Sequence, residues 1–237
     1  MKKRNKSRTA LGVIGGMGPY ADLEFLRILH EKTTVARESD HIPVLYDGNC
    51  LRPDRSSFII GKSLKSPQKS LICSLKMLER EGASVIAMPC NTAHFWLPAL
   101  KKAKKKQTRL IDMVTLVCKS CQKEGVSRVC VLSTDGTREA DIFGERMFRM
   151  GLDSVTPDHE ICKAVTELIE GVKRGEKADL SRLEPLLKNV DCEGFILGCS
   201  ELSVAFHRTR EPSFRYFDGL TVLAERAVCL CGASPVT

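Results

Sequence analysis

Short runs of apolar, β-branched residues alternate with longer segments of helical periodicity along this chain, and this alternation constrains its fold more than any other feature. Such a pattern is typical of an α/β protein, because consecutive parallel strands must be joined by crossover helices. In the first half we expect strands at 11–15, 43–47 and 109–111 and just before Cys90, with helices near 20–34, 67–81, 94–102 and 114–124.

The same order restarts in the second half. We expect a strand at 128–133, a turn at 134–136, a helix capped by Thr137 that runs through Met150, helices at 158–174 and 179–189, and a strand before Cys199. The interval from the first strand to the cysteine is roughly seventy residues in each half, which exceeds a solenoid repeat. Duplication of one unit therefore predicts an α/β fold of two similar parallel-sheet domains, related by pseudo-twofold symmetry with the active site in the cleft between them.

The domain boundaries follow from this repeat. We place the first α/β domain at 10–113 and the second at 114–212. The C-terminal piece, 213–237, holds a strand-like segment at 215–218 and a helix from Leu220, and we expect it to return to the first domain.

Two cysteines occupy matching places at the ends of predicted strands. Cys90 lies in the run SVIAMPCNTAH and Cys199 in the run GFILGCSEL. Ligands of open α/β sheets bind beyond the carboxyl ends of the strands. Two thiols that face one cleft would flank a small molecule, so that one removes a proton and the other returns it.

The composition excludes several classes of protein. No apolar stretch approaches the length of a membrane span, and no secretory segment is visible, so we expect neither a membrane association nor export. The net charge of +8 is concentrated near the N-terminus and in 101–106, and the chain is 5% aromatic, which disfavours nucleic-acid binding.

The cysteine content indicates a reducing compartment. There are eleven cysteines, an odd number, in a chain of 237 residues, so we expect free thiols and a cytoplasmic location rather than a disulfide framework. Cys118 and Cys121 form a C-x-x-C, and Cys229 and Cys231 a C-x-C, but neither has a second pair at zinc-site spacing. We expect no metal and interpret most of these thiols as small buried residues.

Four motifs carry a resemblance to a known family: GGMGP at 15–19, PDR at 53–55, MPCNTAH at 88–94 and LGCSEL at 197–202. In order and spacing they resemble the cofactor-independent aspartate/glutamate racemases, nearest the aspartate racemase branch, and the resemblance spans about 11–228. It implies an isomerase that interconverts L- and D-aspartate without pyridoxal phosphate or metal. It also implies a small acidic amino acid as partner and a possible homodimer.

By this resemblance Cys90 and Cys199 are the two bases, exchanging their roles with the direction of reaction. Racemisation removes a proton from one face of Cα and delivers one to the other, which requires a base and an acid on opposite sides. Each cysteine precedes a predicted helix start, where a thiol pKa is lowered, so we expect both thiol and thiolate to be attainable near neutral pH.

The same resemblance assigns the residues that hold the substrate. Asn91, Thr92 and Thr137 would bind the α-carboxylate, while Arg55 and Lys173 would meet the side-chain carboxylate. An arginine suits this role because its planar guanidinium binds a carboxylate with two parallel hydrogen bonds. The glycines of GGMGP permit a close backbone approach to a ligand.

Three positions differ from the family pattern and leave the substrate open. Phe143 stands where a Tyr is common, Ile161-Cys162 where a Glu-Gln pair is frequent, and Ser200 where Thr is usual. We interpret His94 as structural. Glu201 and Asp218 are at least as well explained by helix capping or packing as by a role in the site.

The alternatives are a broad-specificity aspartate/glutamate racemase, a related maleate isomerase, and a non-catalytic protein that binds acidic amino acids. A decarboxylase of this fold would be expected to have only one of the two cysteines, so the presence of both counts against a decarboxylase. Binding alone needs neither thiol, which disfavours a sensing role.

Overall fold

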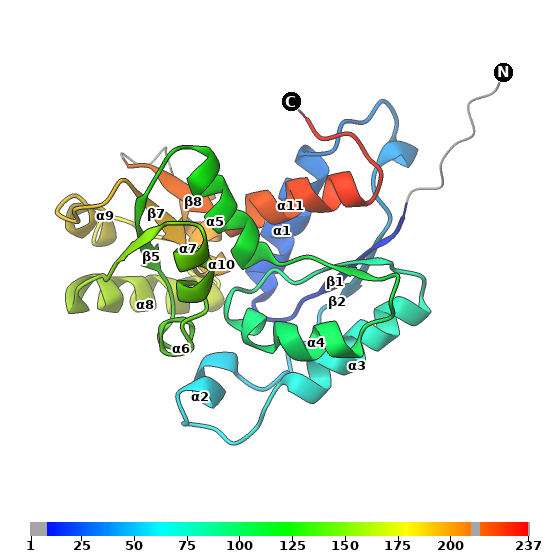
Figure 1. The fold of residues 1–237 in the computed structure, drawn as a ribbon, viewed down its shortest axis with the longest axis horizontal. Coiled ribbons are helices and arrows are strands. Elements are labelled where there is room, and N and C mark those ends of the chain that lie inside the picture. The colour runs from blue at the N-terminus through cyan, green and yellow to red at the C-terminus, as the bar shows by residue number, and fades with distance from the viewer. Residues whose placement is uncertain (1–8, 210–213, 237) are drawn as a thin grey trace.

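The computed structural model describes residues 9–209 and 214–236. Its strands form two four-stranded parallel sheets, one in each half of the chain (Figure 1). The first sheet has the order β2-β1-β3-β4 and the second the corresponding order β6-β5-β7-β8. The predicted fold class of two similar parallel-sheet α/β units is confirmed.

The strands are short and their order along the chain repeats. The first sheet contains β1 (Leu11–Ile14), β2 (Val44–Asp47), β3 (Val85–Ala87) and β4 (Arg109–Leu110). The second contains β5 (Arg128–Leu132), β6 (Asp153–Val155), β7 (Gly194–Leu197) and β8 (Tyr216–Asp218). The strands β1, β3 and β7 are buried along their whole length, as expected for parallel strands that are covered on both faces.

Helices cover both faces of each sheet. The first half contributes α1 (Pro19–Glu31), α2 (Arg55–Ile59), α3 (Gln68–Arg80), α4 (Leu97–Ala103), α5 (Met113–Lys123) and the 3₁₀ turns η1 (Glu38–Asp40) and η2 (Thr92–Trp96). The second half contributes α6 (Asp135–Glu139), α7 (Gly144–Arg149), α8 (His159–Lys173), α9 (Leu183–Leu187), α10 (Ser200–His207) and α11 (Gly219–Leu230). None of the helices in the described ranges has the length and apolar character of a membrane span.

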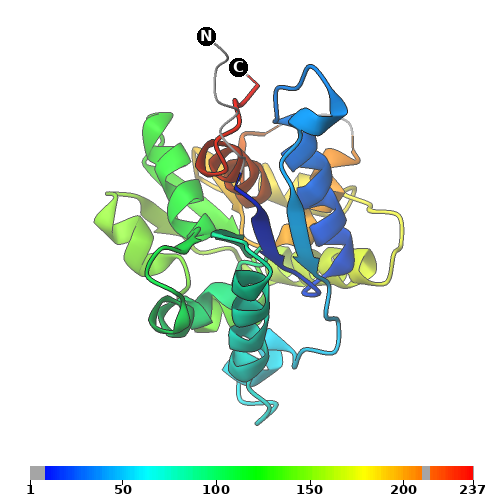
Figure 2. The same ribbon diagram turned by 90° about the vertical axis from the view of Figure 1, so that its right-hand side faces the viewer.

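The last helix of each half packs on the sheet of the other half. The helix α5 follows β4 but buries Val117 and Cys121 against Val129 of β5. The helix α11 follows β8 but buries Leu223 against Leu11 of β1. Figure 2 shows α11 beside β1 and α1, and α5 and α11 also pack on each other. This exchange joins the two halves through their hydrophobic cores.

The expectation that 213–237 returns to the first domain is wrong for its strand. The strand β8 pairs in parallel with β7, Phe217 opposite Ile196, and so completes the second sheet. The helix α11 that follows packs on the first sheet. Because β8 is short and half-exposed at its start, its sequence pattern does not specify which sheet it joins.

The helix expected from Thr137 to Met150 is also wrong in its start and its continuity. Thr134 is the residue that caps α6, since its side chain accepts the backbone N–H of Thr137, which itself lies inside the helix. Asp141 then adopts a positive φ of 45°, a conformation that ends a right-handed helix, and α7 starts three residues later. The short helix α2 and the strand β6 were not predicted.

A buried arginine fixes the loop that leads to α2. The side chain of Arg52 is fully buried and donates hydrogen bonds to the Gly15 carbonyl (3.1 Å), Asp47 Oδ2 (2.6 Å) and Ser70 Oγ (2.8 Å). It thereby joins the ends of β1 and β2 to the segment that carries Arg55.

We expect Arg52→Ala to lower the free energy of unfolding by about 3–5 kcal/mol, because it removes a buried ion pair and leaves its partners unpaired. Urea denaturation followed by circular dichroism measures this loss. Arg182→Ala is the control: its side chain is 81% exposed and pairs with Glu167, and its loss should cost less than about 1 kcal/mol. A similarly small loss for both variants would contradict the anchoring role of Arg52.

Candidate functional site

The two thiols lie at corresponding ends of β3 and β7. Cys90 follows β3 in the loop that leads into η2, and Cys199 follows β7 as the N-cap residue of α10. Each cysteine is 6% exposed. The matching strand order of the two sheets therefore places the thiols at equivalent positions in the two halves.

The two loops that carry the thiols contact each other directly. The hydroxyl of Ser200, next to Cys199, donates a hydrogen bond of 2.9 Å to the carbonyl of Pro89, next to Cys90. This bond is buried and joins residues 111 positions apart in the chain. The carboxyl ends of β3 and β7 therefore meet at the junction between the halves, as the sequence predicted for a shared site.

A buried carboxylate lies against one of the thiols. Cys199 Sγ donates a hydrogen bond of 2.9 Å to Oε2 of Glu201. Glu201 is only 3% exposed. The other oxygen, Oε1, has no hydrogen-bond partner among the described residues. We did not predict this contact, because helix capping or packing explains a Glu at this position at least as well.

Glycines of the GGMGP segment make room for protein groups rather than for an open ligand site. A Cβ on Gly18 would lie 2.3 Å from Oε1 of Glu201, which is closer than atoms can approach. Gly16 has a φ of +77°, and a Cβ there would meet the backbone of Asn49 at 2.3 Å. Gly18 thus lies close against the Glu201 carboxylate of the second half, and Gly16 lies close against the backbone of Asn49.

The thiol pKa values differ from our expectation. Burial raises the pKa of Cys90, although the Arg55 guanidinium opposes that rise. Burial also raises the pKa of Cys199 well above its usual value, and the Glu201 carboxylate raises it further, while Lys173 opposes both. The predicted lowering of the thiol pKa at a helix N-terminus is wrong, because desolvation of the thiolate outweighs it.

Hydroxyl groups from both halves form a cluster at the start of η2, which follows Cys90. Thr92 Oγ1 lies 2.8 Å from Thr137 Oγ1 and 3.3 Å from Thr134 Oγ1, and Ser56 of α2 donates to Thr134. Asn91, which is 3% exposed, leaves Oδ1 without a partner among the described residues. The structure therefore brings Thr92 and Thr137 together and adds Thr134 and Ser56, which the sequence did not identify. It does not place the Asn91 side chain in this cluster, since a Cβ on Gly219 would lie 3.7 Å from Asn91 Oδ1.

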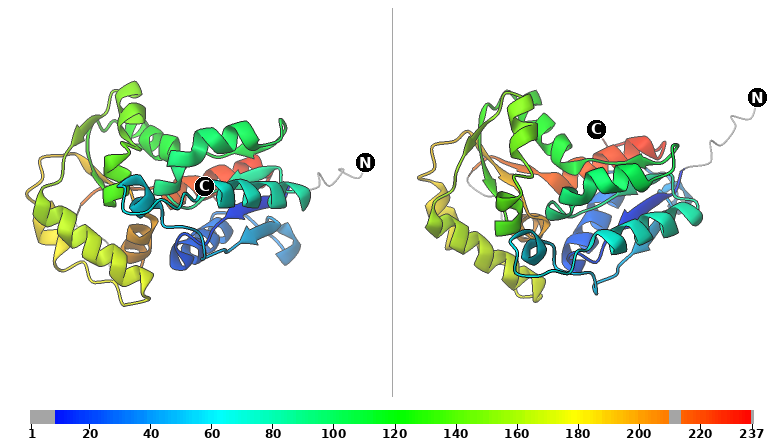
Figure 3. Two further views of the ribbon diagram at one scale, coloured as in Figure 1. Left: turned by 90° about the horizontal axis from the view of Figure 1, so that it is seen from below. Right: turned by 60° about the horizontal axis from the view of Figure 1, so that its bottom comes forward.

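The two predicted cations lie at the rim of this cluster. Arg55 starts α2, donates through Nη2 to the Met17 carbonyl (3.1 Å) and keeps a buried Nε without a partner in the described part of the chain. Lys173 ends α8 and pairs with Glu170 at 2.7 Å. The left-hand view of Figure 3 shows α2 reaching across to the second half, where it contacts α6.

A cavity of about 450 Å³ opens between α2, α6 and α8 above the hydroxyl cluster. Ser56, Thr134 and Lys173 line it, so two members of the cluster and one cation face the same space. Neither Cys90 nor Cys199 lines this cavity, and each is almost fully buried.

His94 has a structural role, as we expected. Its Nδ1 lies 2.9 Å from the Cys90 carbonyl and its Nε2 accepts the backbone N–H of Met113 at 3.1 Å. These contacts assign the neutral tautomer with the proton on Nδ1, and burial lowers the pKa of the ring. The histidine thus joins the Cys90 loop to the start of α5.

A second buried carboxyl group lies near Glu201 and was not predicted. Asp22 of α1 accepts the Gly16 N–H (2.6 Å) and the Tyr46 hydroxyl (2.9 Å). Burial raises its pKa to about 6, and the Glu201 carboxylate contributes to that rise. The sequence does not predict that Asp22 and Glu201 lie near each other, since they belong to helices far apart in the chain.

The remaining residues singled out from the sequence are structural. Asp218 caps α11 by accepting the N–H groups of Leu220 and Thr221. Phe143 and Ile161 are core residues, so the departures from the family pattern leave apolar side chains there. The thiols of Cys118 and Cys121 are buried in the core, as expected for the C-x-x-C.

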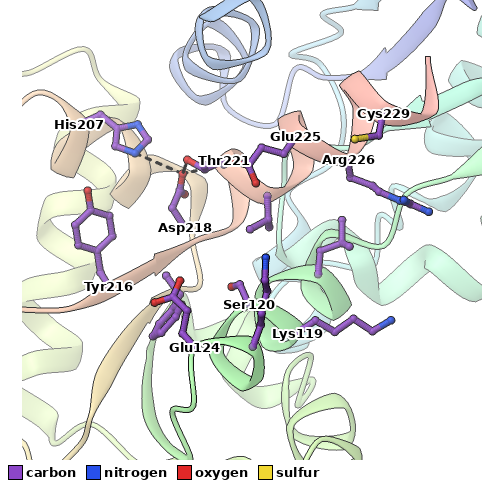
Figure 4. Close-up of a pocket in the computed structure, with 14 residues that line it drawn as sticks. Lys119, Ser120, Glu124, His207, Tyr216, Asp218, Thr221, Glu225, Arg226 and Cys229 are labelled. Atoms are coloured by element: carbon purple, nitrogen blue, oxygen red, sulfur yellow. Dashed lines mark hydrogen bonds and ion pairs between the residues drawn. The ribbon is translucent and has the colours of Figure 1, made fainter. Parts of the chain in front are cut away.

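A larger cavity, of about 630 Å³, lies elsewhere, between α5, α11 and β8 (Figure 4). Figure 4 shows His207 directed towards Asp218 at its edge, with Lys119 and Arg226 on its far side. The residues that line it include neither thiol nor Arg55 or Lys173. Within the described ranges, no three His, Cys, Asp or Glu side chains are arranged to hold a metal ion.

Comparison with known proteins agrees with this geometry. The aspartate racemase of Picrophilus torridus is 26% identical, and its structure superposes with a TM-score of 0.84 over 96% of both chains. A broad specificity amino-acid racemase of Bacillus subtilis is 24% identical over 169 residues, which cover 69% of this chain and 71% of that protein. The glutamate racemase of Francisella tularensis shares the fold, with a TM-score of 0.67 at 15% identity over 94% of this chain and 81% of that one.

A family model described as Asp/Glu/Hydantoin racemase matches residues 14–227, a span that includes both thiols and both cations. The match extends from the end of β1 through β8 and into α11, and includes both loops that carry the thiols. This chain therefore belongs to the Asp/Glu/Hydantoin racemase family and is an isomerase of the racemase type.

Proposed function

We propose that this protein interconverts L- and D-aspartate, with Cys90 and Cys199 as the two bases. The observation that carries the proposal is the hydrogen bond between Ser200 and Pro89, which brings the two thiol-bearing loops from separate sheets to one junction. The similarity to an aspartate racemase over 96% of the chain supports the choice of substrate.

In the proposed reaction one cysteine is a thiolate and the other a thiol. The thiolate takes the Cα proton, so that an S–H bond forms as the C–H bond breaks, and the electron pair stays on the substrate. The other thiol delivers its proton to the opposite face of Cα and becomes the thiolate. The configuration is inverted, and the thiols supply base and acid without a cofactor.

Substrate binding would close the site and exclude water from it, and the positive charges of Arg55 and Lys173 would then stabilise a thiolate more strongly. Lys173 opposes the rise in the pKa of Cys199 that burial causes, and Arg55 opposes the corresponding rise at Cys90. Such cations are worth more where water is excluded, because the effective dielectric constant is lower.

The groups that hold the substrate are those with free hydrogen-bonding capacity. Asn91, Thr92 and Thr137 would bind the α-carboxylate and the amino group: Asn91 and Thr92 directly follow Cys90 in the chain, the Thr92 and Thr137 hydroxyls lie 2.8 Å apart, and Asn91 Oδ1 has no hydrogen-bond partner among the described residues. Arg55 keeps its Nε free and Lys173 lines the adjoining cavity, so both would bind the side-chain carboxylate. Two cations at one end favour a dicarboxylic amino acid.

A broader substrate range is the second candidate. The relative from Bacillus subtilis is described as a broad specificity amino-acid racemase. One methylene group changes discrimination by about 1–3 kcal/mol. Glutamate is therefore tested beside aspartate.

We expect Cys90→Ala and Cys199→Ala each to lower racemisation by roughly 10²–10⁴-fold, since each removes the acid or the base. Proton NMR in D₂O with L-aspartate, and separately L-glutamate, follows the loss of the Cα proton, and chiral chromatography follows the product. Cys118→Ala, another buried thiol, is the control and should keep full activity per folded molecule.

Absence of Cα exchange and of chiral change with both acids, in folded and reduced wild-type protein, would contradict the racemase proposal. A binding protein would instead show a higher Tm with ligand in the wild type and both variants alike. Conversion of maleate without racemisation would indicate the isomerase alternative.

We expect Arg55→Lys to lower kcat/KM for aspartate by roughly 10–100-fold, because a hydrogen bond to a charged group contributes about 1.5–3 kcal/mol and Lys loses the bidentate geometry. Initial rates by chiral chromatography measure this loss. Racemisation of alanine, which lacks the second carboxylate, should change much less. An equal loss for both substrates would show that Arg55 does not bind the side chain.

A further inference from the structure

Glu201 is a buried carboxylate that the two-thiol reaction does not use. It accepts the Sγ–H of Cys199 through Oε2 at 2.9 Å, while Oε1 has no partner among the described residues. A buried carboxylate oxygen without a hydrogen bond costs free energy, so this arrangement is not explained by stability.

The fold makes space for this carboxylate. Gly18, at the N-cap of α1, lies so close to Oε1 that any larger residue would collide with it. Glu201 also lies in the first turn of α10, directly after the thiol it contacts. Elements from both halves therefore hold the carboxylate at Cys199.

The charged groups around the two thiols are not equivalent. Cys199 faces Lys173 from α8 and hydrogen-bonds to Glu201. Cys90 faces Arg55 from α2 and has no carboxylate hydrogen-bonded to its sulfur, while each sulfur receives one backbone N–H, from Ala93 at Cys90 and from Glu201 at Cys199.

More distant carboxylates act on the same thiols. Glu201 and Asp22 of α1 also act on Cys90, but neither is hydrogen-bonded to its sulfur. A hydrogen bond from a thiol to a carboxylate requires the proton on sulfur, whereas a neighbouring cation favours the thiolate.

We propose that Glu201 makes the two thiols unequal: by accepting the Sγ–H of Cys199 it keeps that thiol protonated, so that the resting enzyme presents Cys90 as the base and Cys199 as the acid. Glu201 is thus a positioning residue that acts through Cys199. The meaning of this order for catalysis rests on the proposed racemase function, but the order itself is a property of the substrate-free protein.

Turnover with this order balances. Cys90 gains the Cα proton and Cys199 gives up its own, which leaves a thiolate about 3 Å from the Glu201 carboxylate. Repulsion between these two anions favours the return of a proton to Cys199 from solvent, while Cys90 releases one to solvent. The resting form is then restored.

The test is the pH dependence of alkylation by iodoacetamide, resolved for each cysteine by peptide mass spectrometry, in the wild type and in Glu201→Gln. In the wild type we expect Cys90 to ionise at a lower pH than Cys199. In Glu201→Gln, which keeps the shape and removes the charge, the midpoint for Cys199 should fall by at least about one pH unit. The midpoint for Cys90 should fall less.

Glu79→Gln is the matched control. Glu79 is also a buried carboxylate with one oxygen, Oε2, that has no hydrogen-bond partner in the described residues and lies 3.7 Å from Lys76 Nζ, but its Oε1 binds Thr108 and the backbone of Lys105, just before β4. It should leave both thiol midpoints unchanged. Circular dichroism and Tm establish that each variant is folded.

The pH profile of kcat/KM gives a readout that a purely structural role would not move. Its alkaline limb reports the loss of the protonated thiol and should shift to lower pH in Glu201→Gln. An unchanged Cys199 midpoint in this variant, or ionisation of Cys199 before Cys90 in the wild type, would overturn the proposal. If the variant does not fold, the order in which Cys90 and Cys199 ionise in the wild type tests the proposal by itself. Alkylation also tests the proposal if the protein racemises no amino acid.

Discussion

The exchange of α5 and α11 between the two sheets is the constraint on which the site depends. Each helix leaves the half in which its preceding strand lies and buries its apolar face on the other half. Separating the halves would expose both cores, at about 25 cal/mol for each Å² of apolar surface. The carboxyl ends of β3 and β7 are therefore held together, and the Ser200–Pro89 hydrogen bond forms between them.

The same closure explains the electrostatics of the site. It buries both thiols and raises their pKa values, and it leaves polar atoms without partners among the described residues: Asn91 Oδ1, Arg55 Nε and Glu201 Oε1. An amino acid with two carboxylates offers an ammonium group to acceptors and carboxylates to donors. A substrate of this kind would satisfy groups that the folded chain leaves unsatisfied.

The gross architecture follows from sequence because it depends on local patterns. Buried parallel strands have continuous apolar sequences, which can be recognised locally. The matching order of elements in the two halves then predicted two similar sheets. Errors occurred where local patterns do not decide: β8 has too few residues to specify its sheet, and Thr134 rather than Thr137 caps α6. Asp141 splits the following helix through a positive φ that few residues other than glycine adopt.

The sequence by itself determined the family pattern, the two strand-ending thiols and three of the residues proposed to bind substrate, Arg55, Asn91 and Thr92, because these lie within short motifs. Only the tertiary structure decided how those motifs interact. The contacts of Glu201 with Gly18 and of Thr92 with Thr137 join segments that are far apart in the chain, and the burial of the thiols reverses the pKa shift predicted from their helix positions. Desolvation and contact between distant segments are properties of the packed molecule, and no local pattern encodes them.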